Sequence, residues 1–109
     1  MRAYKIVISN EVLNKDLFDL QPFHAELAAR FGGFNLIEGT GFWCEDASKT
    51  RKVYTKPSEE RSLSYFVTID SDQHSELISI VVGNLPTDLI KWVHIEYNEV
   101  QTNHVNLLA

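Results

Sequence analysis

Cysteine is almost missing from this chain, since Cys44 is the only one, so an internal disulfide framework is excluded. There is no cluster of basic residues either. The 10 lysines and arginines are scattered among 15 acidic residues, and the net charge is -5, which argues against a nucleic-acid partner. The chain also lacks an apolar run long enough to cross a bilayer and a basic start with an apolar signal core. We therefore expect a cytoplasmic protein with no nucleic-acid or membrane partner.

The spacings that bind metals and nucleotides are missing as well. Four dispersed histidines and one cysteine match no zinc or iron pattern. His24-Ala25-Glu26 is half of a zinc deaminase signature, but the Pro-Cys-x-x-Cys half is absent. Gly39-Thr40-Gly41 lacks the third glycine and the following helix of a dinucleotide fingerprint, and no lysine-serine phosphate loop occurs. We expect neither a metal nor a cofactor.

Apolar periodicity predicts a single domain over residues 1–109, a length that suffices for one core. Alternation with a period of two predicts strands at 3–9, 63–69 and 90–97, with an extended segment at 34–44 and a short last strand at 105–108. Residues 45–57 are polar and are predicted to form a long loop.

Two segments have helical spacing. The first has Pro22 in its first turn, Phe23, Leu27 and Phe31 four residues apart, and Gly32-Gly33 as a left-handed stop. The second follows an Asp70-Ser71-Asp72 cap and ends near Gly83-Asn84. The resulting order of strand, helix, strand, strand, helix, strand predicts an α+β, ferredoxin-like βαββαβ sandwich. Its antiparallel sheet carries both helices on one face.

The other face of such a sheet is bare, and we expect it to carry Phe66, Trp92 or Val93, and Tyr97. A bare sheet face with aromatic side chains is commonly buried by self-association, so the pattern predicts a homo-oligomer.

The most informative segment is Pro57-Ser58-Glu59-Glu60-Arg61-Ser62, which stands directly before the clearest predicted strand. A Glu-Glu-Arg run is often no more than a charged strand edge. A carboxylate at the end of a strand is also held by the sheet and can face a cleft made by loops. Adjacent strand residues face opposite ways, so only one of the two glutamates can point into such a cleft.

Two other segments contain residue types that suit a binding site. Thr40-Gly41-Phe42-Trp43 places backbone amides beside two aromatic side chains, which suits the stacking of a flat ring; sheet core or interface is an equally good interpretation of Phe42 and Trp43. The amide-rich residues 97–103 either hydrogen-bond a ligand or form a turn.

Together, these segments resemble the phage enzymes that degrade S-adenosylmethionine, the SAMases, described first as hydrolases and later as lyases. The resemblance runs from about Leu27 to Leu108. It rests on Thr40-Gly41 before an aromatic pair, on the Pro-Ser-Glu-Glu-Arg-Ser block before a strand, and on Tyr97 followed by Val100-Gln101-Thr102. It implies a homotrimer of α/β sandwiches similar to the PII (GlnB-like) signalling fold, with active sites between subunits.

The implied activity is that of an S-adenosylmethionine lyase, which forms 5'-methylthioadenosine and L-homoserine lactone without metal or cofactor. In the host cytoplasm such an enzyme would counter restriction-modification. The resemblance makes Glu60 a catalytic residue. Phe42 and Trp43 stand where the family has a tyrosine, and Tyr54 is our candidate for the missing hydroxyl. The implied substrate-binding residues are Thr40, Gly41, Phe42, Trp43, Glu59, Ser62, Gln101 and Thr102.

Other classes remain open. One is a non-enzymatic, PII-like trimeric module that binds a small molecule or nucleotide and meets a partner through the 45–57 loop. Another is a small phage protein that blocks a host factor with its acidic surface. The chain also resembles small ferredoxin-like domains with a Gly-x-Gly-x-Trp strand, which would leave the activity undefined. Conversion of S-adenosylmethionine separates the lyase from all of these.

Overall fold

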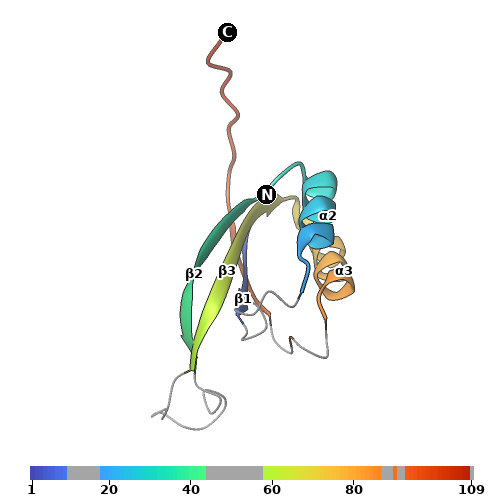
Figure 1. The fold of residues 1–109 in the computed structure, drawn as a ribbon. Helices are drawn as coiled ribbons and strands as arrows, with labels where there is room; N and C mark the ends of the chain where they lie inside the picture. Colours follow the sequence, from blue (N-terminus) through green and yellow to red (C-terminus); the bar gives the residue numbers. More distant parts are fainter. Residues whose placement is uncertain (10–17, 44–57, 87–89, 91–92, 109) are drawn as a thin grey trace.

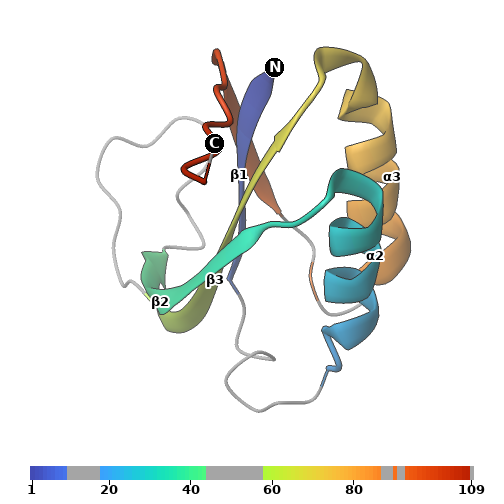
Figure 2. The same ribbon diagram turned by 90° about the horizontal axis from the view of Figure 1, so that it is seen from above.

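The computed structural model describes residues 1–9, 18–43, 58–86, 90 and 93–108. Its elements are, in order, β1 (Arg2–Ser9), α2 (Gln21–Phe31), β2 (Asn35–Trp43), β3 (Ser58–Ile69), a single 3-10 turn η1 (Ser71–Gln73), α3 (His74–Asn84) and β4 (His94–Glu99). The strands form one sheet in the order β2-β3-β1-β4, and every neighbouring pair is antiparallel. Both helices lie side by side on one face (Figures 1 and 2).

The predicted fold class is confirmed at this level: the chain is α+β, with a four-stranded antiparallel sheet and two helices, an arrangement compatible with a ferredoxin-like fold. Alternation explains why the sheet has one core face. Every second residue of β1 from Tyr4 and of β3 from Leu63 is buried against the helices, and the residues between them lie on the opposite face. We call that second, helix-free face the bare face. The buried set is Tyr4, Ile6, Ile8, Leu63, Tyr65, Val67 and Ile69.

The two helices begin and end where the sequence predicts. Pro22 lies in the first turn of α2, and Gly32, at a φ of 82°, caps its end by donating its N–H to the Ala28 carbonyl at 3.0 Å. Asp70 and Gln73 form a reciprocal capping box before α3. Leu27 of α2 and Leu77 of α3 belong to the same core and have no exposed surface.

Several predicted boundaries are wrong. β3 begins at Ser58, so the Glu-Glu-Arg-Ser block lies inside the strand, because the pairing with β2 continues to Trp43. β4 begins at His94, four residues later than predicted. Residues 105–108 form no strand. Figure 1 shows this end of the chain leaving the sheet beyond the N-terminus, where it has no strand to pair with. The predicted 45–57 loop and Cys44 lie outside the described residues.

The bare face differs from the prediction in one aromatic residue. Tyr97 lies directly opposite Tyr4, and opposed residues share a face, so Tyr97 is on the helix side of the sheet. Their rings are 5.1 Å apart between centroids. Phe66 is on the bare face as predicted, Val93 precedes β4, and Trp92 lies outside the described residues. No helix in the described part of the chain is long and apolar enough to span a bilayer.

Candidate functional site

The β2/β3 hairpin brings two of the predicted segments together. Thr40 lies opposite Arg61, Gly41 opposite Glu60, and Phe42 opposite Glu59. Directly opposed residues in an antiparallel pair have Cβ atoms about 5 Å apart. The Thr-Gly-aromatic segment and the Glu-Glu-Arg-Ser block are therefore paired neighbours on one hairpin, although the 44–57 segment separates them in the sequence. Trp43 lies opposite Ser58 at the end of this pairing.

The two glutamates lie on opposite faces of this hairpin. Leu63 and Tyr65 are buried under the helices, so alternation places Arg61 and Glu59 on the helix side of β3. Glu60 and Ser62 then lie on the bare face. The hairpin thus offers two different surfaces, each with one carboxylate of the pair.

On the bare face, Glu60 is held by the end of β1. The Ser9 hydroxyl donates a hydrogen bond of 3.1 Å to Oε2 of Glu60, and Ser9 itself lies opposite Ser62 across the β1/β3 pair. A Cβ added at Gly39, the strand neighbour of Ser62, would meet no atom within 4 Å. Ser9, Glu60 and Ser62 therefore form a polar, half-buried group beside an open stretch of backbone.

On the helix side, Arg61 and Glu38 form an ion pair of 2.8 Å between Nη2 and Oε1. The Phe42 side chain, farther along the hairpin, is 65% exposed. An exposed aromatic ring on a strand has a free face on which a flat ligand can stack.

Gln101 and Thr102 lie at the other end of the sheet. Glu99 is opposite Arg2, and the Val100 N–H bonds to the Met1 carbonyl at 3.0 Å, whereas Ser9 and Glu60 meet at the far end of β1. Seven residues of strand separate these ends, or roughly 23 Å at 3.3 Å per residue. One chain therefore does not bring Gln101 and Thr102 to Glu60, and a site that contains all three needs a second copy. Tyr54 lies outside the described residues.

His24, at the start of α2, is a further titratable group beside the hairpin. Its Nε2 lies 2.7 Å from the hydroxyl of Tyr65, which is fully buried. Burial lowers the pKa of His24, and the charge of Asp19 opposes that shift in part. Burial also raises the pKa of Tyr65. The pair is therefore neutral at neutral pH.

This pair predicts a loss of stability in acid. The folded-state pKa of His24 is below its unfolded value of 6.5, so acidification from neutral pH protonates the unfolded chain first and favours unfolding. We expect the free energy of unfolding, measured by urea titration at several pH values, to fall below pH 6.5 more steeply in the parent than in His24→Gln. Equal slopes would show that His24 does not contribute.

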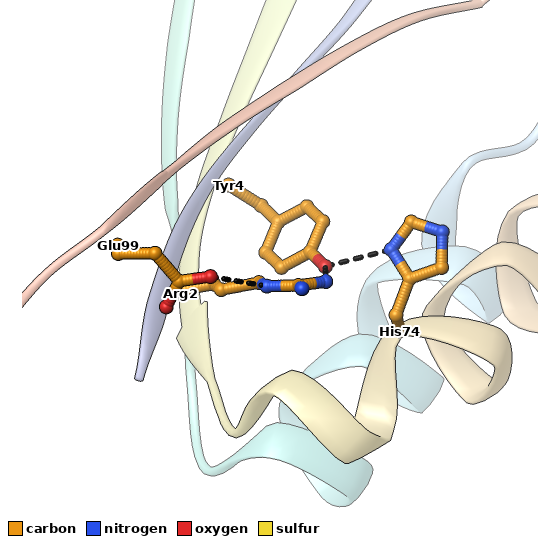
Figure 3. Close-up of polar contacts among 4 residues, drawn as sticks. All are labelled: Arg2, Tyr4, His74 and Glu99. Carbon is orange, nitrogen blue, oxygen red and sulfur yellow. Dashed lines mark hydrogen bonds and ion pairs between the residues drawn. The ribbon is translucent and has the colours of Figure 1, made fainter.

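A second polar cluster joins β1, β4 and α3 at the opposite end of the sheet (Figure 3). Arg2 donates to Glu99 at 2.8 Å and to the Tyr4 hydroxyl at 3.3 Å. That hydroxyl lies 2.7 Å from Nδ1 of His74, and the Arg2 guanidinium lies 4.3 Å from the ring centroid of Tyr97. The Arg2–Glu99 bond joins β1 to β4, and the Tyr4–His74 contact joins β1 to α3, so the cluster's role is to hold the edge strand β4 on the fold.

We expect Tyr4→Phe to lower the free energy of unfolding by about 1–2 kcal/mol, because it removes the shared partner of Arg2 and His74 at a residue that is 1% exposed. Urea unfolding measures this change. The matched control is Tyr97→Phe, since the Tyr97 hydroxyl has no hydrogen-bond partner among the described residues; a change within about 0.5 kcal/mol is expected there. Equal losses in both variants would contradict the role of the Tyr4 hydroxyl.

No family model matches the chain, and no curated protein is similar to it in sequence. Among the described residues, no group of three or more histidine, cysteine, aspartate or glutamate side chains is arranged to hold a metal ion.

Sequence reasoning missed Ser9 and the Arg61–Glu38 pair. Both depend on the register between strands, which no spacing within the chain encodes. The only signal for Ser9 was its position as the polar last residue of a predicted strand.

Proposed function

We propose that this protein is an S-adenosylmethionine lyase that acts as a homotrimer of PII-like subunits. The observation that carries the proposal is the register of the β2/β3 hairpin, which sets Gly41 opposite Glu60. Two of the segments that carry the resemblance to SAMases thereby lie on one hairpin. If these short segments resembled the family only by chance, there would be no reason to expect them to be paired in the fold.

The reaction needs no water, metal or second substrate. A carboxylate oxygen of S-adenosylmethionine attacks the γ-carbon of the same molecule, the bond from that carbon to sulfur breaks, and its electrons leave with methylthioadenosine. The new carbon–oxygen bond closes homoserine lactone. Atoms and charge balance, because the sulfonium loses its charge as the carboxylate does.

A protein accelerates such a ring closure mainly by orientation. Holding reacting atoms about 3–3.5 Å apart contributes roughly 7 kcal/mol or more. Removal of water helps further, since the reaction cancels the charges of the carboxylate and the sulfonium, and water stabilises the charged reactant most.

Glu60 is the residue we assign to the substrate ammonium. Its carboxylate is positioned by the Ser9 hydroxyl, and it lies on the bare face beside the open backbone at Gly39. A charge-assisted hydrogen bond to the ammonium fixes one end of the methionine chain. Phe42 lies opposite Glu59 on the helix side, so its exposed ring does not share this face with Glu60.

The trimer is supported by two features of one subunit. Ile37 on the bare face is 59% exposed and Phe66 lies beside it across β2 and β3, so apolar surface is left uncovered. Gln101 and Thr102 are at the wrong end of their own sheet to reach Glu60. Association of subunits through the bare face would bury the apolar surface and bring a neighbour's Gln101 and Thr102 to Glu60.

The test is to incubate the purified protein with S-adenosylmethionine and to separate the products by chromatography, with mass from light scattering in parallel. We expect methylthioadenosine and homoserine lactone in equal amounts from a trimer. Tight binding without turnover would favour a PII-like binding module instead, and a monomer at micromolar concentration would remove the interfacial site.

Activity is expected to survive chelation. The reaction uses no Lewis acid, so the rate in EDTA should equal the rate in untreated buffer. Loss of activity in EDTA, with recovery on adding zinc or magnesium, would contradict the intramolecular mechanism.

A further inference from the structure

The last described residues, 101–108, form a tail that follows β4 and pairs with no strand in the described part of the chain. Every residue of the tail is exposed, and Leu107 and Leu108 are 91% and 97% exposed. Figure 1 shows the tail running away from the sheet beyond the N-terminus. Val105 is exposed as well, so three apolar side chains of one short segment face water. Apolar surface gathered in this way marks a site of interaction.

The free edge of β2 has the complementary property. Among the described residues β2 pairs with β3 alone, so the backbone groups along its other edge are open to a further strand. Proteins commonly block such an edge with lysine or proline, and the nine residues of β2 contain neither. Ile37 also leaves apolar surface exposed on this strand. The edge therefore suits an extended segment with apolar side chains, which would add to the sheet through its backbone.

One antiparallel register matches the tail to this edge. It sets Leu107 opposite Ile37 and Leu108 opposite Leu36, and opposed side chains share a face. Leu107 then covers the exposed Ile37 on the bare face. Leu108 lies on the helix side, where Leu36 packs against the core. Both leucines of the tail thereby gain an apolar partner.

The same register sets Val105 opposite Gly39. A Cβ added at Gly39 would meet no atom within 4 Å, so a neighbouring valine has room there. A slip of one residue in either direction would set Val105 or Leu107 opposite Glu38 and would turn each side chain to the other face. An apolar side chain opposite a carboxylate gains little, so the residues favour the first register.

The tail cannot take up this register on its own β2. The pairing starts with Gln101 opposite Trp43, at the end of β2. Gln101 follows Val100, whose N–H bonds to the Met1 carbonyl at 3.0 Å, at the opposite end of the sheet. The two ends are roughly 23 Å apart along the strands, and the outer strands β4 and β2 are three spacings, or roughly 14 Å, apart across the sheet. The tail therefore fits the β2 edge of a second copy.

We propose that the tail of each subunit adds as an antiparallel strand to the β2 edge of the next subunit. This inference rests on the association in the proposed function, but not on its chemistry, and head-to-tail contacts of this kind close into a ring. Asn103 of the tail lies opposite Gly41, which is itself opposite Glu60. Since glycine has no side chain, the amides of Asn103 and Gln101, which share this face, reach toward Glu60 over Gly41. The site around Glu60 is thus completed by Gln101 of the neighbouring tail.

Disulfide trapping tests the register. One chain carries Ile37→Cys, a second chain with an affinity tag carries Leu107→Cys, and Cys44→Ser removes the native thiol from both. Opposed Cα atoms lie about 4.5–5.5 Å apart, within the range of about 4.4–6.8 Å that a disulfide spans. We expect the co-expressed chains to form a disulfide between one tagged and one untagged chain on mild oxidation. The matched control replaces Leu107→Cys by Leu108→Cys, which faces the other side and should give at most about a tenth of that product. Equal yields, or no mixed product, would overturn the proposal.

Removal of residues 104–109 tests the tail itself. The shortened chain keeps Gln101 and Thr102, and its fold should survive, because every described residue that is removed is exposed. We expect the mass from light scattering to fall from that of a trimer to that of a monomer at micromolar concentration. A shortened chain that remains a trimer would overturn the proposal. If the disulfide forms while the parent leaves S-adenosylmethionine unchanged, the lyase reaction is refuted and this assembly is supported, so the two failures are distinguishable.

Discussion

Glu60→Gln is expected to lower kcat/KM for S-adenosylmethionine by about tenfold or more. The substitution keeps the size of the side chain and an oxygen that can accept from Ser9, but it removes the charge that pairs with the substrate ammonium. A charge-assisted hydrogen bond is about twice as strong as a neutral one. A loss of about 1.4 kcal/mol in the transition state is tenfold in rate. The change in kcat/KM is measured from the rate of methylthioadenosine formation at several substrate concentrations.

Two further variants test whether the effect belongs to this position. Glu59 lies on the helix side of the same strand. Glu59→Gln should therefore lower kcat/KM less than Glu60→Gln does, because only Glu60 faces the proposed reaction centre. Glu26→Gln on α2 keeps an acceptor for the Asn84 amide and should leave turnover unchanged. The free energy of unfolding of each variant should lie within about 0.5 kcal/mol of the parent value. Loss confined to Glu59→Gln would show that the reacting face is the helix side.

Ile37→Glu is expected to dissociate the trimer and to abolish turnover with it. Ile37 is on the bare face, 59% exposed in the single subunit. If association buries this face, a carboxylate there loses its water, at an effective cost of several kcal/mol. Since 1.4 kcal/mol is tenfold in affinity, association weakens by at least about a hundredfold. Light scattering should report the mass of a monomer at micromolar concentration.

The control introduces a glutamate in the same way on the helix layer of the molecule. Val82, on α3, is 60% exposed, so Val82→Glu alters a side chain of similar exposure far from the bare face. It should keep both the trimer and the activity. A trimer that survives Ile37→Glu, or one that is lost in both variants, would contradict an interface on the bare face.

The elements of this fold follow largely from local patterns. Alternation at Tyr4, Ile6 and Ile8 predicts the buried face of β1, because a half-buried strand exposes every second residue. Gly32 marks the end of α2, since it takes up the left-handed conformation at a φ of 82° with no steric cost. Such signals lie within a few residues of one another, and a single sequence contains them.

What the sequence did not predict depends on pairing between strands. Tyr97 was expected on the bare face, yet its register opposite Tyr4 places it under the helices. The contact of Ser9 with Glu60 spans 51 residues, and it requires β1 and β3 to be neighbours in a particular register. The ion pair of Glu38 and Arg61 likewise arises from the pairing of β2 with β3.

The candidate site also has a part that the sequence predicts and a part that depends on strand pairing. The Glu-Glu-Arg-Ser block is identified by its position before the clearest predicted strand, and the Thr-Gly-aromatic segment by backbone amides beside two aromatic side chains. Alternation requires Glu59 and Glu60 to face apart. Which glutamate faces which side needed the burial of Leu63. The separation of Gln101 from Glu60 needed the whole sheet order.

The origin of the product's oxygen tests intramolecular attack most directly. The reaction is run in water enriched in heavy oxygen, and the homoserine derived from the product is examined by mass spectrometry. Attack by the substrate's own carboxylate predicts a γ-oxygen of ordinary mass, with any label confined to the carboxyl group after the lactone opens. Heavy oxygen on the γ-carbon would mean that water attacks, and no methylthioadenosine at all would mean that this chain is not a lyase.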